Sequence, residues 1–260
     1  MDWRIAKVHK ETIEKIEYKP KISSNEFAGI YVYGWDRDFK LEENEAPILA
    51  FRHYSQYSYP IFLFCNKDKT GEVEKLADKY ENINIILIEE MRSIKDYDHF
   101  MITECFQRIP KMFNRLLNFH EDGFLLKAGW EDFVLEHDFD YIGAPWNHIE
   151  TQDNEYALDK YLKFKIKDGT KWEDIKSNTV VGNGGFCYRK RDKALQVVDR
   201  IDLKDYEQKW KGGQVCPDDM FYSFHGFGLG YFKPVSVELA KQFSEEPYCG
   251  ADTFGFHRLA

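Results

Sequence analysis

Two short acidic sequences contain residue types that could bind a metal ion or move a proton. The first is His120-Glu121-Asp122-Gly123, which follows an apolar run that predicts a β-strand. Acidic groups at the carboxyl end of a strand, next to a turn glycine, are well placed to hold a hard divalent cation, and the cation would in turn hold phosphates. An ordinary Asp-Gly turn has the same sequence, so both interpretations stay open.

The second acidic sequence is Cys216-Pro217-Asp218-Asp219. Proline followed by two acids predicts the first turn of a helix, where the helix dipole stabilises a carboxylate and keeps its pKa low. This effect alone would explain the acids. A carboxylate held at a helix start in a cleft could also act as a general base. Neighbouring positions diverge by about 100° around a helix axis, so only one of the two acids can easily face a cleft.

Three further sequences contain candidate ligand-binding residues. Asn183 is followed by Gly184 and Gly185, and such a loop allows close approach of the backbone to a ligand and leaves amide N–H groups to bind it. Trp146 follows a Gly-Ala-Pro turn, where its indole could stack on a sugar or close the core. His257 has an imidazole suited to a Mn²⁺-like ion, although a single histidine in such a place is usually only solvated.

The elements that must position these residues alternate along the chain. Apolar runs predict strands near residues 28–34, 60–65, 83–88 and 115–120, and amphipathic runs predict helices near residues 47–57, 72–80, 96–109 and 192–198. This alternation is typical of a mostly parallel sheet covered on both faces. We therefore predict an α/β/α sandwich with Rossmann-like winding, which binds ligands beyond the carboxyl ends of its strands. Tyr33, at one such end, is a candidate binding residue.

The rest of the chain shows no internal repeat and no break in composition, which predicts a single domain over residues 1–260. Residues 1–24, rich in Lys and Glu, predict a peripheral and partly helical segment. The polar residues 147–178 predict an excursion from the sheet, with a helix near residues 154–164.

Composition excludes several classes of protein. The chain of 260 residues has a formal charge of −9, which argues against a dedicated nucleic-acid binder. No apolar run approaches the roughly 20 residues of a membrane span, and the first residues lack the apolar segment of a signal peptide. Five widely spaced cysteines, without a CxxC pair, predict reduced thiols and a cytoplasmic location. The sequence contains no P-loop and no GxGxxG after the first predicted strand.

The order of the motifs is more specific than any one of them. HEDG, DYIGAPW, VGNGGF, PDD and FGFH follow one another along the chain. This series resembles that of uncharacterised GT-A-like glycosyltransferases, which share an Asp-Gly or Asp-Ser turn, DYIGAPW, VGNGGF, a PED-like helix start and a terminal FGxH. The resemblance covers roughly residues 45–257, and DYIGAPW and VGNGGF are its specific parts.

The resemblance implies a GT-A fold and transfer of a sugar from a nucleotide-sugar donor, such as a UDP- or GDP-sugar, to a glycan or other hydroxyl acceptor. His120, Glu121, Asp122 and Gly123 occupy the place of the DxD motif, together with Tyr33 on the donor side. Only Asp122 matches the motif's acids, so His120 is expected near the ribose or base.

Further roles follow from the same resemblance. Asp122 and His257 are the implied ligands of Mn²⁺ or Mg²⁺. Asp219 is the implied base of an inverting transfer, with Asp218 beside it. The implied sugar- or acceptor-binding residues are Trp146, Asn183, Gly184 and Gly185.

Two other classes of protein remain open from the sequence. A glycan-binding relative without turnover would use Trp146 and the glycine-rich loop as a lectin-like cleft. A metal-dependent phosphoryl or nucleotidyl transferase, or a hydrolase, would release phosphate or pyrophosphate without moving a sugar. The sequence has neither a P-loop nor a second acidic metal cluster, which counts against this second alternative.

Overall fold

The fold is built around a six-stranded sheet in the order β3-β2-β1-β4-β7-β6. The computed structural model describes residues 3–17, 19, 21–23, 26–33, 41–89, 91–146, 164–171, 181–214 and 216–258. The strands of this sheet are β1 (Phe27–Tyr33), β2 (Ile61–Asn66), β3 (Ile83–Ile88), β4 (Arg115–Phe119), β6 (Tyr141–Gly143) and β7 (Phe186–Lys190). β1 to β4 run parallel to one another, and β7 runs antiparallel to both β4 and β6. The predicted mostly parallel α/β sheet is therefore confirmed.

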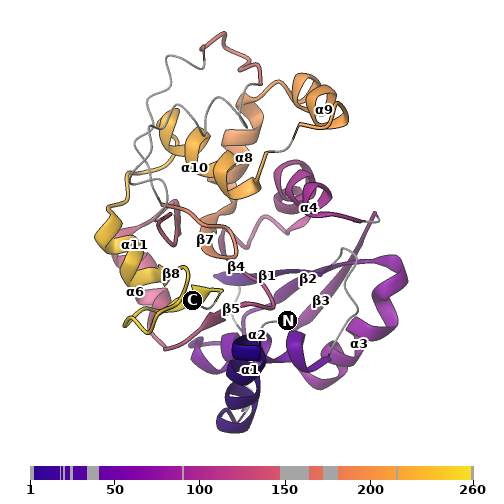
Figure 1. The fold of residues 1–260 in the computed structure, drawn as a ribbon, viewed down its shortest axis with the longest axis vertical. Helices are drawn as coiled ribbons and strands as arrows, with labels where there is room; N and C mark the ends of the chain where they lie inside the picture. Colours follow the sequence, from indigo (N-terminus) through magenta and orange to yellow (C-terminus); the bar gives the residue numbers. More distant parts are fainter. Residues whose placement is uncertain are drawn as a thin grey trace.

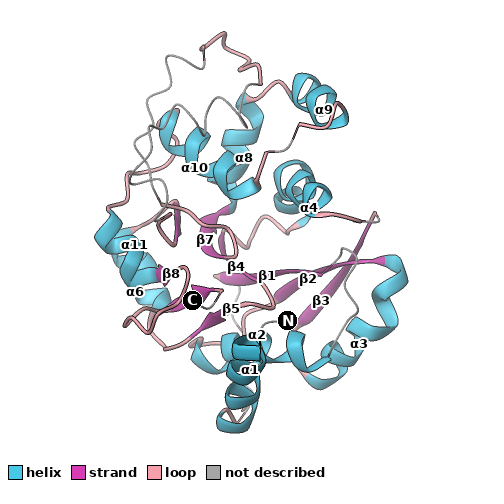
Figure 2. Ribbon diagram, in the orientation of Figure 1, coloured by secondary structure: helices cyan, strands magenta, loops and turns pink. Residues whose placement is uncertain are grey.

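Helices cover both faces of this sheet (Figure 2). Their bounds are α1 (Trp3–Lys15), α2 (Leu41–Tyr54), η1 (Lys67–Lys69), α3 (Thr70–Lys79), α4 (Ile94–Phe100), η2 (Met101–Cys105), α5 (Phe106–Arg108), α6 (Trp130–His137), α8 (Arg191–Arg200), α9 (Leu203–Lys211), α10 (Asp218–Gly228) and α11 (Val237–Phe243). The predicted helix near residues 96–109 is one helical stretch, α4-η2-α5, with a π-helical turn in its middle.

Alternate side chains of the strands pack into separate cores on the two faces. Ala28, Ile30 and Val32 of β1 pack with α4, α8 and α10. Tyr31 and Leu63 pack on the other face with α2, α3, α6 and α11. Figure 1 shows the first group of helices above the sheet and α2 and α3 below it. Burial on both faces explains why these strands are almost entirely apolar.

A second, small sheet joins distant parts of the chain. β5 (Gly123–Leu125) pairs antiparallel with β9 (Gly255–His257), and β9 pairs parallel with β8 (Ser244–Glu245). In this register Gly123 lies opposite His257. The C-terminal segment is thus held beside the carboxyl end of β4.

The N-terminal helices depart from the prediction at one point. The sequence predicts a helix that starts at Pro47, whereas α2 begins at Leu41 and contains that proline. Two contacts hold the turn before it: the Tyr31 hydroxyl donates to Asn44 at 2.7 Å, and Glu45 pairs with Lys79. α1 packs against α2, as expected for a partly helical peripheral segment.

Some predictions fall on residues that the structure does not describe. The excursion 147–178, with its predicted helix near 154–164, lies outside the described residues except for 164–171. Among the described residues, no helix is both long and apolar enough to cross a membrane. All five cysteines are free thiols, and only Cys249 is exposed.

Candidate active site

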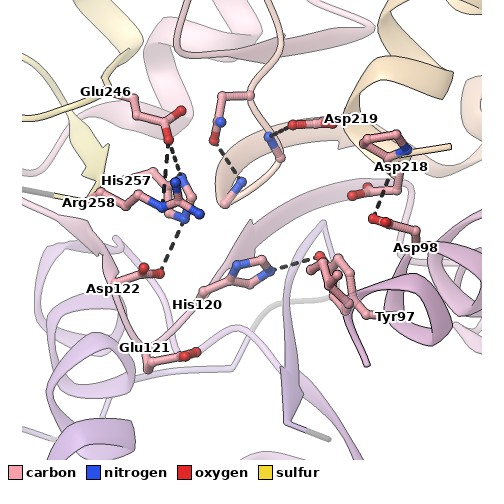
Figure 3. Close-up of a pocket in the computed structure, with 15 residues that line it drawn as sticks. Tyr97, Asp98, His120, Glu121, Asp122, Asp218, Asp219, Glu246, His257 and Arg258 are labelled. Atoms are coloured by element: carbon pink, nitrogen blue, oxygen red, sulfur yellow. Dashed lines mark hydrogen bonds and ion pairs between the residues drawn. The ribbon is translucent and has the colours of Figure 1, made fainter. Parts of the chain in front are cut away.

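A pocket of about 330 Å³ opens at the carboxyl end of β4. Its walls are α4, the turn after β4, the glycine-rich loop before β7, the start of α10 and the C-terminal segment (Figure 3). The lining residues are Ile94, Tyr97, Asp98, His120, Glu121, Asp122, Asn183, Gly184, Gly185, Pro217, Asp218, Asp219, Glu246, His257 and Arg258. The pocket lies at the sheet edge where α/β proteins bind their ligands.

Two histidines and one aspartate meet on one side of this pocket. One possible ligand atom from each of His120, Asp122 and His257 lies within 4.8 Å of the others. His257 Nε2 lies 3.3 Å from Asp122 Oδ1, and His257 Nδ1 lies 3.1 Å from Glu246 Oε1. His120 Nε2 lies 2.8 Å from the Tyr97 hydroxyl. The turn after β4 and the end of β9 thus bring together Asp122 and His257, which the sequence analysis paired.

The charges in this cluster support one another. Burial alone would lower the pKa of His257, but its contacts with Asp122 and Glu246 raise that pKa to about 9. Burial opposes ionisation of Asp122, yet the neighbouring imidazoles hold its pKa well below the usual range. Asp122 is therefore a carboxylate at neutral pH, as a metal ligand must be, whereas His257 is protonated in the ion-free protein and would have to release a proton to an incoming ion.

The donor set fits a divalent metal ion. Ligand atoms that share one ion at about 2.1 Å lie about 3.4 Å apart in a tetrahedral site, so shifts of up to about an ångström would bring the three atoms, now within 4.8 Å of one another, around one centre. Glu246 holds the second nitrogen of His257, which is how an outer carboxylate orients a histidine ligand. His120, Asp122 and His257 are the residues that could hold the ion.

The glycine-rich loop has a different role from the one expected. Its amides are already used: Gly184 N donates to Asp219 Oδ2 at 3.2 Å, and Gly185 N donates to Asn183 Oδ1 at 2.9 Å. A Cβ at Gly185 would lie 2.1 Å from the His257 ring, and one at Gly123 would lie 2.6 Å from the Gly185 carbonyl oxygen. These glycines therefore make room for the histidine and for the loop itself, rather than presenting amides to a ligand.

The two acids at the start of α10 lie in different surroundings. Asp218 is 3% exposed and forms a 2.7 Å ion pair with buried Arg189. Asp219 is half-buried and accepts from Gly184 N and, at 2.7 Å, from Met220 N. Burial, followed by the charge of Asp218, raises the pKa of Asp219 to about 7. The expectation of a low pKa at this helix start is wrong for Asp219, because burial and the neighbouring Asp218 carboxylate raise its pKa.

Sequence reasoning missed several residues of the pocket. Asp98, on α4, accepts a hydrogen bond from Asp218 N at 3.2 Å through its Oδ1. Tyr97, Glu246 and Arg258 also line the pocket. A signal for Asp98 was present, because it shares one helix face with the buried residues three, four and seven positions later. An acid on such an apolar helix face is buried, and a buried carboxyl group needs a hydrogen-bond or ion-pair partner.

Two candidates lie away from the pocket. Trp146 is 6% exposed and its ring stacks on Phe224 at 6.3 Å, so the indole closes the core. Tyr33 is 7% exposed and packs in the core on the opposite face of the sheet from α4 and α10. Neither lines the pocket, whereas Glu121 and Asn183 do.

The architecture and the position of the pocket define a GT-A-like α/β protein. The crystal structure of mouse Xyloside xylosyltransferase 1, apo form, is similar, with a TM-score of 0.53 at 9% sequence identity over 89% of this chain and 97% of that chain. At this identity the similarity concerns the fold alone.

The sequence itself places the chain in a family. No curated protein gives a significant match. A family model matches residues 82–257, which is more than half of the chain. The chain belongs to this family, which is described as "Protein of unknown function (DUF5672)".

Proposed function

We propose that the protein is a metal-dependent glycosyltransferase that moves a sugar from a nucleotide-sugar donor to a hydroxyl group of a glycan acceptor. One observation carries this proposal. A His-Asp-His cluster and a carboxylate with a pKa of about 7 face the same pocket of a GT-A-like fold. The similar fold of a xylosyltransferase supports the class of reaction.

The donor side of the pocket is the cluster of His120, Asp122 and His257. A divalent ion held there would offset the negative charge of the leaving diphosphate. Two imidazoles beside one carboxylate suit Mn²⁺ better than Mg²⁺, which prefers oxygen ligands. The family's motif series suggests UDP or GDP as the nucleotide. The free thiols support the proposed cytoplasmic location.

The acceptor side of the pocket is the start of α10. Asp219 is the proposed general base, because a pKa of about 7 lets its carboxylate take a proton near neutral pH. Asp218 is engaged by Arg189 at 2.7 Å and is therefore not the base. Attack by a hydroxyl that Asp219 deprotonates, in a single displacement, would invert the anomeric configuration.

Donor binding tests the proposal directly. Thermal unfolding is measured with a panel of UDP- and GDP-sugars, with and without Mn²⁺. A true donor at about 100 times its Kd stabilises the protein by roughly 2.7 kcal/mol. Asp122→Ala should lose the Mn²⁺-dependent part, whereas Asp252→Ala, a side chain 92% exposed outside the pocket, should keep it.

Three outcomes would contradict parts of the proposal. Unchanged Mn²⁺ dependence in Asp122→Ala would refute the metal site. Release of phosphate without sugar transfer would identify a hydrolase or phosphoryl transferase. Glycan binding without consumption of any donor in the panel would identify a non-catalytic relative.

A further inference from the structure

Asp98 joins two helices that meet at the pocket. It belongs to α4, is 5% exposed, and its Oδ1 accepts from the backbone N–H of Asp218 at 3.2 Å. The first N–H groups of a helix have no partner within the helix. The N-cap residue of α10 is Pro217, which has no side chain able to accept. The acceptor that a capping residue normally provides therefore comes from another helix (Figure 3).

This contact brings a third carboxyl group next to Asp218 and Asp219. Within the described part of the chain, the cation that pairs with these three acids is Arg189 on β7, whose contact is with Asp218 at 2.7 Å. The other titratable neighbours of these acids are tyrosines and thiols: Tyr97 on α4, Tyr141 on β6, Tyr206 on α9, Tyr222 on α10, Cys105, Cys187 and Cys216. Burial raises the pKa of each of these seven groups, so all are neutral at pH 7.

The charges around Asp98 therefore do not balance if every acid is ionised. Among the described residues, three buried or half-buried carboxylates beside one guanidinium would leave two negative charges uncompensated. Uncompensated buried charge is costly, and such a group binds a proton instead. Arg189 pairs with Asp218, and of the two remaining acids Asp98 is buried whereas Asp219 is half-buried, so Asp98 is the less open to water of these two.

We propose that Asp98 is a positioning residue of the pocket that works as a neutral carboxylic acid, capping α10 and fixing Asp218 and Asp219 without adding a third charge. Burial, followed by the charge of Asp218, raises the pKa of Asp98 to about 9, which agrees with this role. The role applies to any ligand of the pocket, whether or not it contains a sugar. It thus goes beyond the proposed function and fails or holds independently of it.

Two substitutions separate the parts of this role. Asp98→Asn keeps an acceptor oxygen and stays neutral, whereas Asp98→Ala removes the acceptor. Asp202→Ala is the matched control, because Asp202 caps the neighbouring helix α9 through Lys204 N and Asp205 N and does not line the pocket. All three variants can be compared without a ligand.

Urea unfolding between pH 4 and pH 9 provides the first measurement. Between the ordinary pKa of an aspartate and the raised pKa of Asp98, the native state keeps the Asp98 proton while the unfolded chain releases it. The free energy of unfolding therefore falls as pH rises between these two values. The folding equilibrium constant of the wild type, relative to Asp98→Asn, should fall by up to tenfold per pH unit. The wild type and Asp202→Ala should both show this fall, because both keep Asp98. The ratio of their folding equilibrium constants should therefore stay constant with pH. A wild-type to Asp98→Asn ratio that does not change with pH would overturn the proposal.

Carbon-13 NMR of the carboxyl groups provides the second measurement and does not depend on the stability of the variants. Asp98 should stay protonated through neutral pH, and titration near the ordinary value for aspartate would overturn the proposal. Asp219 should keep its apparent pKa in Asp98→Asn. In Asp98→Ala that pKa should fall toward its ordinary value as water enters the loosened helix start. An unchanged Asp219 titration in a folded Asp98→Ala would refute the positioning role.

Discussion

Replacing Gly185 by alanine is expected to abolish metal binding while leaving the fold in place. The new Cβ would lie 2.1 Å from Cδ2 and 2.2 Å from Nε2 of His257. Carbon atoms in contact are about 3.5 Å apart, so the imidazole must retreat by roughly 1.4 Å. Metal–ligand distances tolerate only about 0.2 Å. The ring therefore cannot stay at the position where it faces Asp122.

The assay is Mn²⁺ binding, followed by electron paramagnetic resonance of the free ion. Overpacking of this kind costs about 1–3 kcal/mol, which a substantial core can tolerate. Gly71→Ala is the control, because a Cβ there meets nothing within 4 Å. The control should bind Mn²⁺ like the wild type. If a folded Gly185→Ala bound Mn²⁺ with wild-type affinity, either His257 would not be a ligand or the loop would yield instead of the ring.

Three other substitutions are expected to have distinct effects. Asp219→Asn should reduce sugar transfer by about 10²–10⁴-fold. Wild-type activity should rise with pH through about pH 7, because the carboxylate acts as a base only without its proton, and this rise should be absent in the variant. Profiles of activity against pH for the two proteins check both effects. Glu131→Gln should gain up to about 3 kcal/mol of stability over the wild type between pH 4.5 and pH 7. Burial raises the pKa of Glu131 from 4.5 to about 7, so the unfolded wild-type chain releases this proton at a lower pH than the native state does. Urea unfolding at the two pH values measures the difference in stability, and a difference that does not change with pH would contradict the prediction. Trp146→Ala should cost about 3–5 kcal/mol of stability without changing donor affinity, as expected for a core residue. Weaker donor binding by the folded variant would show that Trp146 belongs to the donor site.

The strands of the fold were predictable because a strand that is buried on both faces appears in the sequence as a nearly continuous run of apolar residues. Each end of the first four strands lies within one residue of its predicted position. The start of α2 was not predictable in this way. Proline is favoured in a first turn, but side-chain contacts to Asn44 and Glu45 extend the helix ahead of it.

The acids and histidines of the site were predictable as residue types, but their surroundings were not. A helix start favours acids, yet nothing in PDD shows that one of them pairs with Arg189 and that the other is desolvated. The glycine-rich loop was predicted as a source of free amides, whereas its glycines make room for neighbouring side chains. Gly185 makes room for the His257 ring of β9, and Gly184 lies against Asp219 of α10, and no local sequence pattern reveals either neighbour. Asp98 was missed because its partner lies on another helix.

The small β5-β9-β8 sheet has a consequence for the order in which the molecule becomes functional. During synthesis the last strand of the main sheet, β7, emerges long before the segment that contains His257. Protein segments begin to fold as they leave the ribosome, with N-terminal parts first. A nascent chain can thus complete its main sheet while its candidate cation site still lacks one of the two histidines. Any capacity to hold an ion at this site would therefore appear only after β9 has been made and has paired with β5, and not when the main sheet folds.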